Sequence, residues 1–138
     1  MDKRLPGILE KLMYRLGAER NQYRMLRNED GEQKIYFREM ICIHKRKMGK
    51  YAEFETFQGT FRERISLDRL LEELDSKEFF LADRSNIINL RNVQSIRDNV
   101  ICLEEGHTLE LNQYRIEAAK KRIEAYWRER IWNEQPTS

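Results

Sequence analysis

The spacing of apolar residues divides the chain into a helical start, a strand-rich middle and a helical end. Near the N-terminus, apolar positions recur at the helical period of about 3.6 residues, which predicts a helix over 4–16. Its apolar face consists of Leu5, Ile8, Leu9, Leu12 and Leu16. Pro6 suits a first helical turn, and Gly17 follows the last apolar position, where helices commonly end. Residues 17–22 are then a short polar connector.

The middle of the chain consists of short apolar or alternating stretches that are separated by turn residues. These stretches predict strands over 23–27, 34–37, 40–44, 50–56 and 60–64, and again over 79–81, 86–90, 93–96, 100–103 and 108–111. Between the two groups, Ser66 is a suitable N-cap for a short helix near 67–74. Because short consecutive strands joined by tight turns pair with their neighbours, we expect antiparallel sheets.

The last long pattern is helical again and covers residues 113–132. Its apolar stripe consists of Ile116, Ala119, Ile123, Tyr126, Trp127 and Ile131. The predicted fold class is therefore mainly β, with small antiparallel sheets and one short internal helix, flanked by N- and C-terminal helices. Residues 133–138 are a tail.

The composition is that of a soluble globular protein. The chain has 138 residues and a mass of 16.8 kDa, which suits one domain or one domain with a helical extension. No apolar run approaches the roughly 20 residues of a membrane span, and no signal peptide is visible. Cys42 and Cys102 lie in apolar, strand-like stretches. We therefore expect small core residues in a reducing compartment, and a cytoplasmic protein.

The sequence offers little for enzyme chemistry. It contains no glycine-rich phosphate loop, no GxSxG nucleophile elbow and no HExxH zinc motif. Acidic pairs such as Glu72–Glu73 are typical of solvated faces, so we assign no catalytic residue. His44 and His107 have no ligand-type partner at helical spacing, so we predict no metal and no cofactor.

The net charge is only +2, so the case for an anionic partner depends on where the cations cluster. Residues 44–51 are the most uneven segment, with four fixed positive charges and no acid: Lys45, Arg46, Lys47 and Lys50. The segment lies between two predicted strands and contains Gly49, which indicates an exposed loop. Such a loop suits phosphate contact, because each neutralised phosphate releases counterions. It equally suits a solubilising turn that protects a sheet edge, and both interpretations stay open.

Two further polar groups lie at the ends of predicted strands. One consists of Arg84, Arg91 and Arg97. Arg84 either faces outward in a turn or forms a surface ion pair with Asp83. The other group, residues 112–115, stands where the final helix begins, and its amide and guanidinium side chains are those that contact base edges. Ordinary capping of the helix by Asn112 is the alternative.

Residues 79–96 carry more information than their composition. Their sequence, FFLADRSNIINLRNVQSI, has a Phe pair, a polar step ending in Ser85, an apolar doublet, Asn89, and then Val93 and Ile96. This run resembles the central signature of LytTR-type DNA-binding domains. Residues 37–43, 66–74 and 101–111 look like that family's strand start, internal helix and next hairpin. The resemblance extends from about Tyr23 to about Tyr126.

The resemblance implies an elongated fold of three small antiparallel sheets with a short helix. It also implies a bacterial transcription regulator that contacts successive grooves of double-stranded DNA through loops. The family's base-contacting loops correspond here to Lys50, Tyr51, Arg84, Asn112, Gln113, Tyr114 and Arg115. Two departures keep the family's base preference from carrying over. Asp83 stands where the family often has His, and residues 112–115 replace a Ser-Arg-Arg loop.

These positions divide into two expected roles. The lysines and arginine of the loop anchor phosphates and set the register: Lys45, Arg46, Lys47 and Lys50. Base contacts are expected from Arg84 and Arg115 to guanine, and from Asn112 and Gln113 to adenine. Lys50 and Tyr51 suit either role.

The predicted helix over 4–16 resembles the final helix of a response-regulator receiver, which commonly precedes this family's DNA-binding part. No receiver lies in this chain, so we expect a helix and linker over 1–22, a LytTR-like domain over 23–132 and the tail. We favour a C-terminal portion of a two-component regulator over a free-standing one. The expected partners are direct repeats in DNA, a second protomer bound there, and a receiver domain.

Two other functions compete with DNA binding. The first is a protein-interaction or dimerisation module, in which the amphipathic end helices dock a partner through exposed Trp127 and Trp132. The second is an RNA-binding β module, which needs exposed aromatics on one sheet face. Tyr36 and Phe37 are adjacent and point to opposite faces of a strand, which disfavours a stacking platform.

Overall fold

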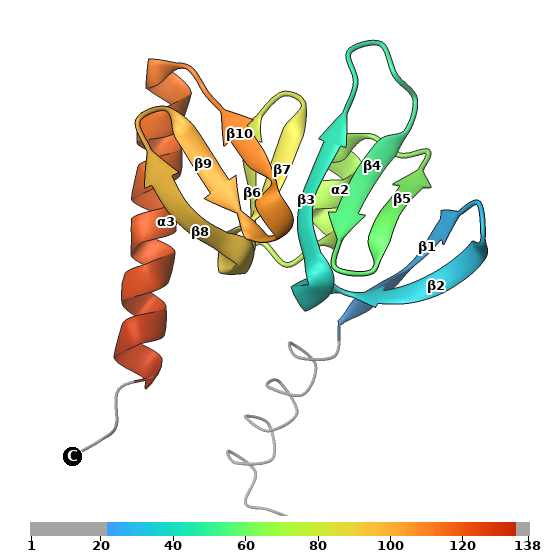
Figure 1. Cartoon of the computed structure of the whole chain (residues 1–138), viewed down its shortest axis with the longest axis horizontal. Coiled ribbons are helices and arrows are strands. Elements are labelled where there is room, and N and C mark those ends of the chain that lie inside the picture. The colour runs from blue at the N-terminus through green and yellow to red at the C-terminus, as the bar shows by residue number, and fades with distance from the viewer. Residues whose placement is uncertain (1–21, 135–138) are drawn as a thin grey trace, which may run out of the picture.

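Short antiparallel strands dominate the fold (Figure 1). The structure is a computed structural model. It describes residues 22–134, with side chains as far as Arg130. The strands are β1 (Tyr23–Asn28), β2 (Gly31–Tyr36), β3 (Met40–Lys45), β4 (Ala52–Thr56), β5 (Gly59–Glu63), β6 (Phe79–Asp83), β7 (Asn86–Asn89), β8 (Val93–Arg97), β9 (Val100–Leu103) and β10 (Thr108–Glu110). The helices are α2 (Leu67–Glu73) and α3 (Gln113–Glu134), with single 3-10 turns η1 (Phe37–Glu39), η2 (Leu90–Asn92) and η3 (Glu104–Gly106). The expected mainly β fold with one short internal helix and a C-terminal helix is confirmed.

The strands form two sheets rather than the three that the family resemblance implies. One sheet has seven strands in the order β2-β1-β5-β4-β3-β7-β6, and the other has the order β10-β9-β8. The β1–β2 hairpin joins the larger sheet through a single residue pair, Arg27 opposite Arg62. This one pair merges what would otherwise be a separate two-stranded sheet.

The alternation seen in the sequence decides which face of each strand is buried. In β4, Ala52, Phe54 and Thr56 are buried, whereas Glu53 and Glu55 face outward and are only partly covered. Phe54 lies opposite Phe61 of β5, so the two rings share the inner face. The predicted cap is also present, since the Ser66 hydroxyl accepts a hydrogen bond from the backbone N–H of Arg69 (3.2 Å) at the start of α2.

Two apolar clusters hold the fold together. The first lies between the inner face of the larger sheet and α2, and includes Leu26, Ile43, Phe54, Phe61 and Leu70. The second is formed by α3, β8–β10 and residues of β3, β6 and β7, and includes Ile88, Leu103, Ile116, Ile123 and Tyr126. α3 runs along the second sheet, so its apolar stripe is covered by the chain itself (Figure 1).

Two buried asparagines join the larger sheet to η2. The Asn89 amide donates to the backbone carbonyls of Phe37 (3.0 Å) and Met40 (2.8 Å). The Asn92 amide donates to the carbonyls of Arg38 (3.2 Å) and Met40 (2.7 Å). These bonds satisfy carbonyls where the chain leaves η1 and enters β3, which explains amides at these positions of an otherwise apolar run.

Several sequence expectations have a definite outcome at the ends of the molecule and at single residues. The predicted helix over 4–16 and nearly all of the connector lie outside the described residues, as do 135–138. α3 extends to Glu134, two residues past its predicted end. Trp127, which the interaction-module alternative takes as exposed, is partly covered because it packs against the second cluster.

The cysteines are partly buried and unpaired, in line with their expected packing role. Burial, with a smaller contribution from the charge of Glu55, raises the pKa of the Cys42 thiol to about 12. A raised pKa keeps the thiol protonated at neutral pH, and the thiolate is the nucleophilic form. Among the described helices, none is long and apolar enough to cross a membrane.

Candidate nucleic-acid interface

The basic segment forms the loop between β3 and β4. A tight turn shapes it, because the Gly49 N–H donates to the Arg46 carbonyl at 2.8 Å. Arg46, Lys47 and Lys50 are exposed, and Met48 at the tip is 94% exposed with a left-handed φ of 66°. Lys45 differs from them, because it is partly buried and its ammonium donates to the Ile65 carbonyl at 3.4 Å. The loop therefore presents three of its four cations to solvent.

Tyr51, the last residue of this loop, is held by a residue of β5. The guanidinium of Arg62 lies over the Tyr51 ring, 4.6 Å from its centroid. This contact was not apparent from local pattern, because Arg62 is one of two arginines in an alternating strand. The strand register explains the contact. Arg62 lies opposite Glu53, and Glu53 is two residues after Tyr51, so the side chains of Tyr51 and Glu53 point to the same face of the sheet.

Arg84 is exposed in the turn between β6 and β7. Asp83 builds this turn, because its Oδ1 accepts hydrogen bonds from the Ser85 backbone N–H (2.8 Å) and the Asn86 amide (2.9 Å). The Asp83 carboxylate is thus engaged in the turn, and no ion pair between it and Arg84 is found within the described residues. An acid at this position therefore orients the arginine outward.

Residues 112–115 start α3 in the way that ordinary capping requires. The Asn112 Oδ1 accepts a hydrogen bond from the Arg115 backbone N–H at 2.8 Å. The Gln113 amide donates to Glu117 at 3.0 Å. Tyr114 is 81% exposed, and Arg115 is partly covered. Tyr114 is therefore the most open side chain of the group, while the Asn112 oxygen already has a partner.

The three groups lie at one edge of the molecule. The β3–β4 loop, the β6–β7 turn and the connection from β10 to α3 all lie at the upper edge in Figure 1. The Lys45 N–H donates to the Ser85 carbonyl at 2.9 Å, so the basic loop begins beside the Arg84 turn. Arg91 is not part of this edge, because β7 runs away from it to η2, where Arg91 lies 3.7 Å from Glu78.

A polar cluster lies on β3 and β4 below the basic loop. Glu55 accepts a hydrogen bond from the Thr60 hydroxyl (2.6 Å) and contacts His44 Nε2 at 2.9 Å. Partial burial opposes ionisation, but these two bonds and the nearby His107 together hold the pKa of Glu55 below its ordinary value. Within the described residues, no group of three or more His, Cys, Asp or Glu side chains could hold a metal ion.

Comparison with known proteins assigns this chain to a family. The architecture is that of a small β-rich domain with exposed polar loops at one edge. The family model of the LytTr DNA-binding domain matches residues 32–124, and the chain belongs to that family. Its fold is similar to that of a LytTr DNA-binding domain of a response regulator from Bacillus cereus. That similarity has a TM-score of 0.66 at 17% identity and covers 75% of this chain and 97% of that one. No curated protein matches the chain.

Proposed function

We propose that the protein is a transcription regulator that binds double-stranded DNA in a sequence-specific manner. In this proposal, the loops at the polar edge enter successive major grooves. The observation that carries it is the common edge shared by the β3–β4 loop, the β6–β7 turn and the start of α3. Membership of a DNA-binding family gives that edge its most direct explanation.

The residues divide by exposure into two roles. Arg46, Lys47 and Lys50 contact phosphates, which set register without reading bases. Lys45 contributes less, because its ammonium is already bonded to Ile65. Arg84 is the main base-reading residue, since its turn holds it outward and an arginine fits guanine O6 and N7.

Two exposed tyrosines and the polar residues at the start of α3 supply further contacts to DNA in this proposal. Tyr51 and Tyr114 lie exposed beside the cations and pack against sugar or base edges. Arg115 reads guanine and Gln113 reads adenine. Asn112 does so less readily, because a bidentate contact to adenine would remove its oxygen from the helix cap.

We further propose that the protein acts on direct repeats in the bacterial cytoplasm. Two protomers occupy one site, and a receiver domain supplies the signal. The described residues of one protomer present three loop groups along one edge, and a second protomer doubles the length of DNA that is read.

Selection from a random duplex pool at physiological salt tests the proposal. Sequential enrichment is expected to yield a motif that occurs twice in the same orientation. A pool without enrichment after several rounds would contradict sequence-specific binding. The Arg84→Ala protein, carried through the same rounds, should lose the preference at one position of each repeat.

The competing functions have less support. A dimerisation module needs an uncovered apolar face, but Ile116, Ala119 and Ile123 of α3 are buried in the second cluster. An RNA-binding platform needs adjacent exposed aromatics. Phe37 instead packs against the first cluster, in edge contact with Phe79. DNA binding therefore remains the function that the exposed groups favour.

A further inference from the structure

A hollow of about 220 Å³ lies beside the basic loop and extends onto the sheet. It is lined by Arg46, Gly49, Lys50, Tyr51, Glu53 and Arg62. The first four belong to the loop, but Glu53 lies in β4 and Arg62 in β5. The hollow thus joins the loop to the outer face of the larger sheet, which no sequence motif marks as part of the interface.

The charges around the hollow favour an anion. Three cations line it against one carboxylate, that of Glu53. Glu53 pairs with Arg46 (3.6 Å), whose side chain is 85% exposed. Arg62 and Lys50 have no such ion pair within the described residues. Their charges are therefore the ones left for a ligand.

The strand register places Arg62 between a like charge and an opposite charge. Arg62 lies opposite Arg27 of β1 on one side and opposite Glu53 of β4 on the other, and like charges at directly opposed positions destabilise a sheet. Arg27 is 3.3 Å from Glu32 and Glu53 pairs with Arg46, whereas Arg62 forms no ion pair within the described residues and stacks on the Tyr51 ring. This stack fixes the guanidinium at the wall of the hollow. An anion bound there would relieve the repulsion between the two arginines.

We propose that this hollow binds a backbone phosphate of DNA, and that Arg62 extends the interface from the loop onto β5. The inference rests on the proposed function and names a contact for it outside the loop. Arg62 would contact the phosphate and also position Tyr51, while Lys50 supplies the second unpaired cation and Arg46 offsets the charge of Glu53. A planar guanidinium suits this role because it can stack and donate hydrogen bonds at once.

Salt titrations of random-duplex binding by the full chain test the proposal. Arg62→Gln should lower the slope of log affinity against log salt by about one unit, the effect of one lost phosphate contact. Arg64→Gln is the matched control, because Arg64 is exposed two residues away and does not line this hollow. Its slope should equal that of the original protein. Arg62→Lys should restore most of the slope, since it keeps the charge.

Two results would overturn the inference. One is an unchanged slope for Arg62→Gln, and the other is an equal loss for Arg62→Gln and Arg64→Gln, which would indicate a general charge effect. If the original protein bound no DNA at all, the proposed function itself would fail, which is a different outcome.

A measurement on the unaltered protein removes any dependence on folding of the variants. The Nε–H resonances of its arginines can be followed by NMR during titration with the random duplex. The Arg62 resonance should shift together with the Gly49 amide, and the Arg64 resonance should stay in place. A stationary Arg62 resonance at saturating DNA would overturn the proposal.

Discussion

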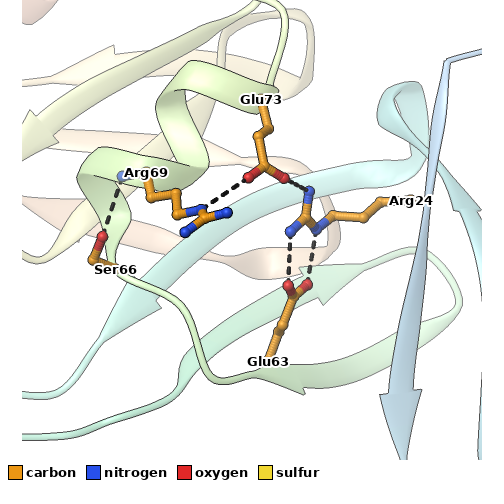
Figure 2. A network of polar contacts seen from close by, with 5 residues as sticks. All are labelled: Arg24, Glu63, Ser66, Arg69 and Glu73. Atoms are coloured by element: carbon orange, nitrogen blue, oxygen red, sulfur yellow. Dashed lines mark hydrogen bonds and ion pairs between the residues drawn. The ribbon is translucent and has the colours of Figure 1, made fainter.

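Arg24 of β1 and Glu63 of β5 form a two-bonded ion pair, with Nε–Oε1 and Nη2–Oε2 distances of 2.8 and 2.7 Å (Figure 2). The same guanidinium reaches Glu73 of α2 at 2.6 Å, and Glu73 also contacts Arg69. The backbone joins β1 to β5 through a single residue pair. The ion pairs of Arg24 with Glu63 and Glu73 therefore help to hold the β1–β2 hairpin against the sheet and α2.

We predict that Arg24→Gln lowers the free energy of unfolding by about 1–3 kcal/mol, because it leaves the partly buried Glu63 without its cation. Urea unfolding measures this change. Arg27→Gln is the control, since its ion pair with Glu32 is well exposed and should matter by no more than about 0.5 kcal/mol. Equal effects of the two substitutions would show that the hairpin does not depend on Arg24.

Asn89→Ala should cost about 1–3 kcal/mol of unfolding free energy. The substitution leaves the Phe37 carbonyl without its amide donor, while the Met40 carbonyl keeps the bond from Asn92. Urea unfolding again reports the loss. Gln94→Ala, at an exposed position of β8, should be neutral. A neutral Asn89→Ala would contradict the structural role given to this amide.

Stability should fall on acidification in part because of Glu55. Its pKa in the folded protein lies below that of the unfolded chain, about 4.3. A depressed carboxyl pKa contributes stability above the unfolded value, and that stability is lost as the pH falls through the folded value. Urea unfolding between about pH 6 and pH 3 should therefore show the difference between the protein and Glu55→Gln shrinking. A difference that stays constant over this range would rule out the contribution.

Arg84→Ala should weaken binding to the selected DNA site by about 1–3 kcal/mol and relax preference at one base position. The fold should be unaffected, because Arg84 is exposed in a turn that Asp83 builds. Lys47→Ala is the matched comparison. It should weaken binding to all sequences alike and lower the salt slope by about one unit. Equal losses on selected and random DNA for Arg84→Ala would remove it from base reading.

The strands, the internal helix and the main cationic loop were predictable, because local patterns determine them. Alternation fixed the faces of β4, and Ser66 marked the start of α2. The roles of Asn89 and Arg62 were not predictable from local pattern. Asn89 depends on Met40, which is far along the chain, and Arg62 depends on Tyr51, which lies in the loop before the neighbouring strand. The partial covering of Trp127 was not predictable for a similar reason, since only the packed sheet shows how much of a helix it covers.

Prediction of the site was limited in the same way, because local sequence does not show which side chains are already bonded to distant partners. Charge density located the loop over 44–51, but it could not distinguish Lys45, which donates to Ile65, from its exposed neighbours. At residues 112–115 the capping interpretation and the binding interpretation both persist. The Asn112 oxygen caps α3, while Tyr114 and Gln113 remain exposed.

Fluorescence anisotropy of a labelled random duplex pool, titrated with the full chain, tests the central claim most directly. The titration is repeated from about 50 to about 200 mM salt. We predict binding at low salt that weakens with a steep log–log slope, because several phosphates are neutralised at the polar edge. Absence of binding at the lowest salt, or affinity that does not change with salt, would contradict DNA binding through this edge.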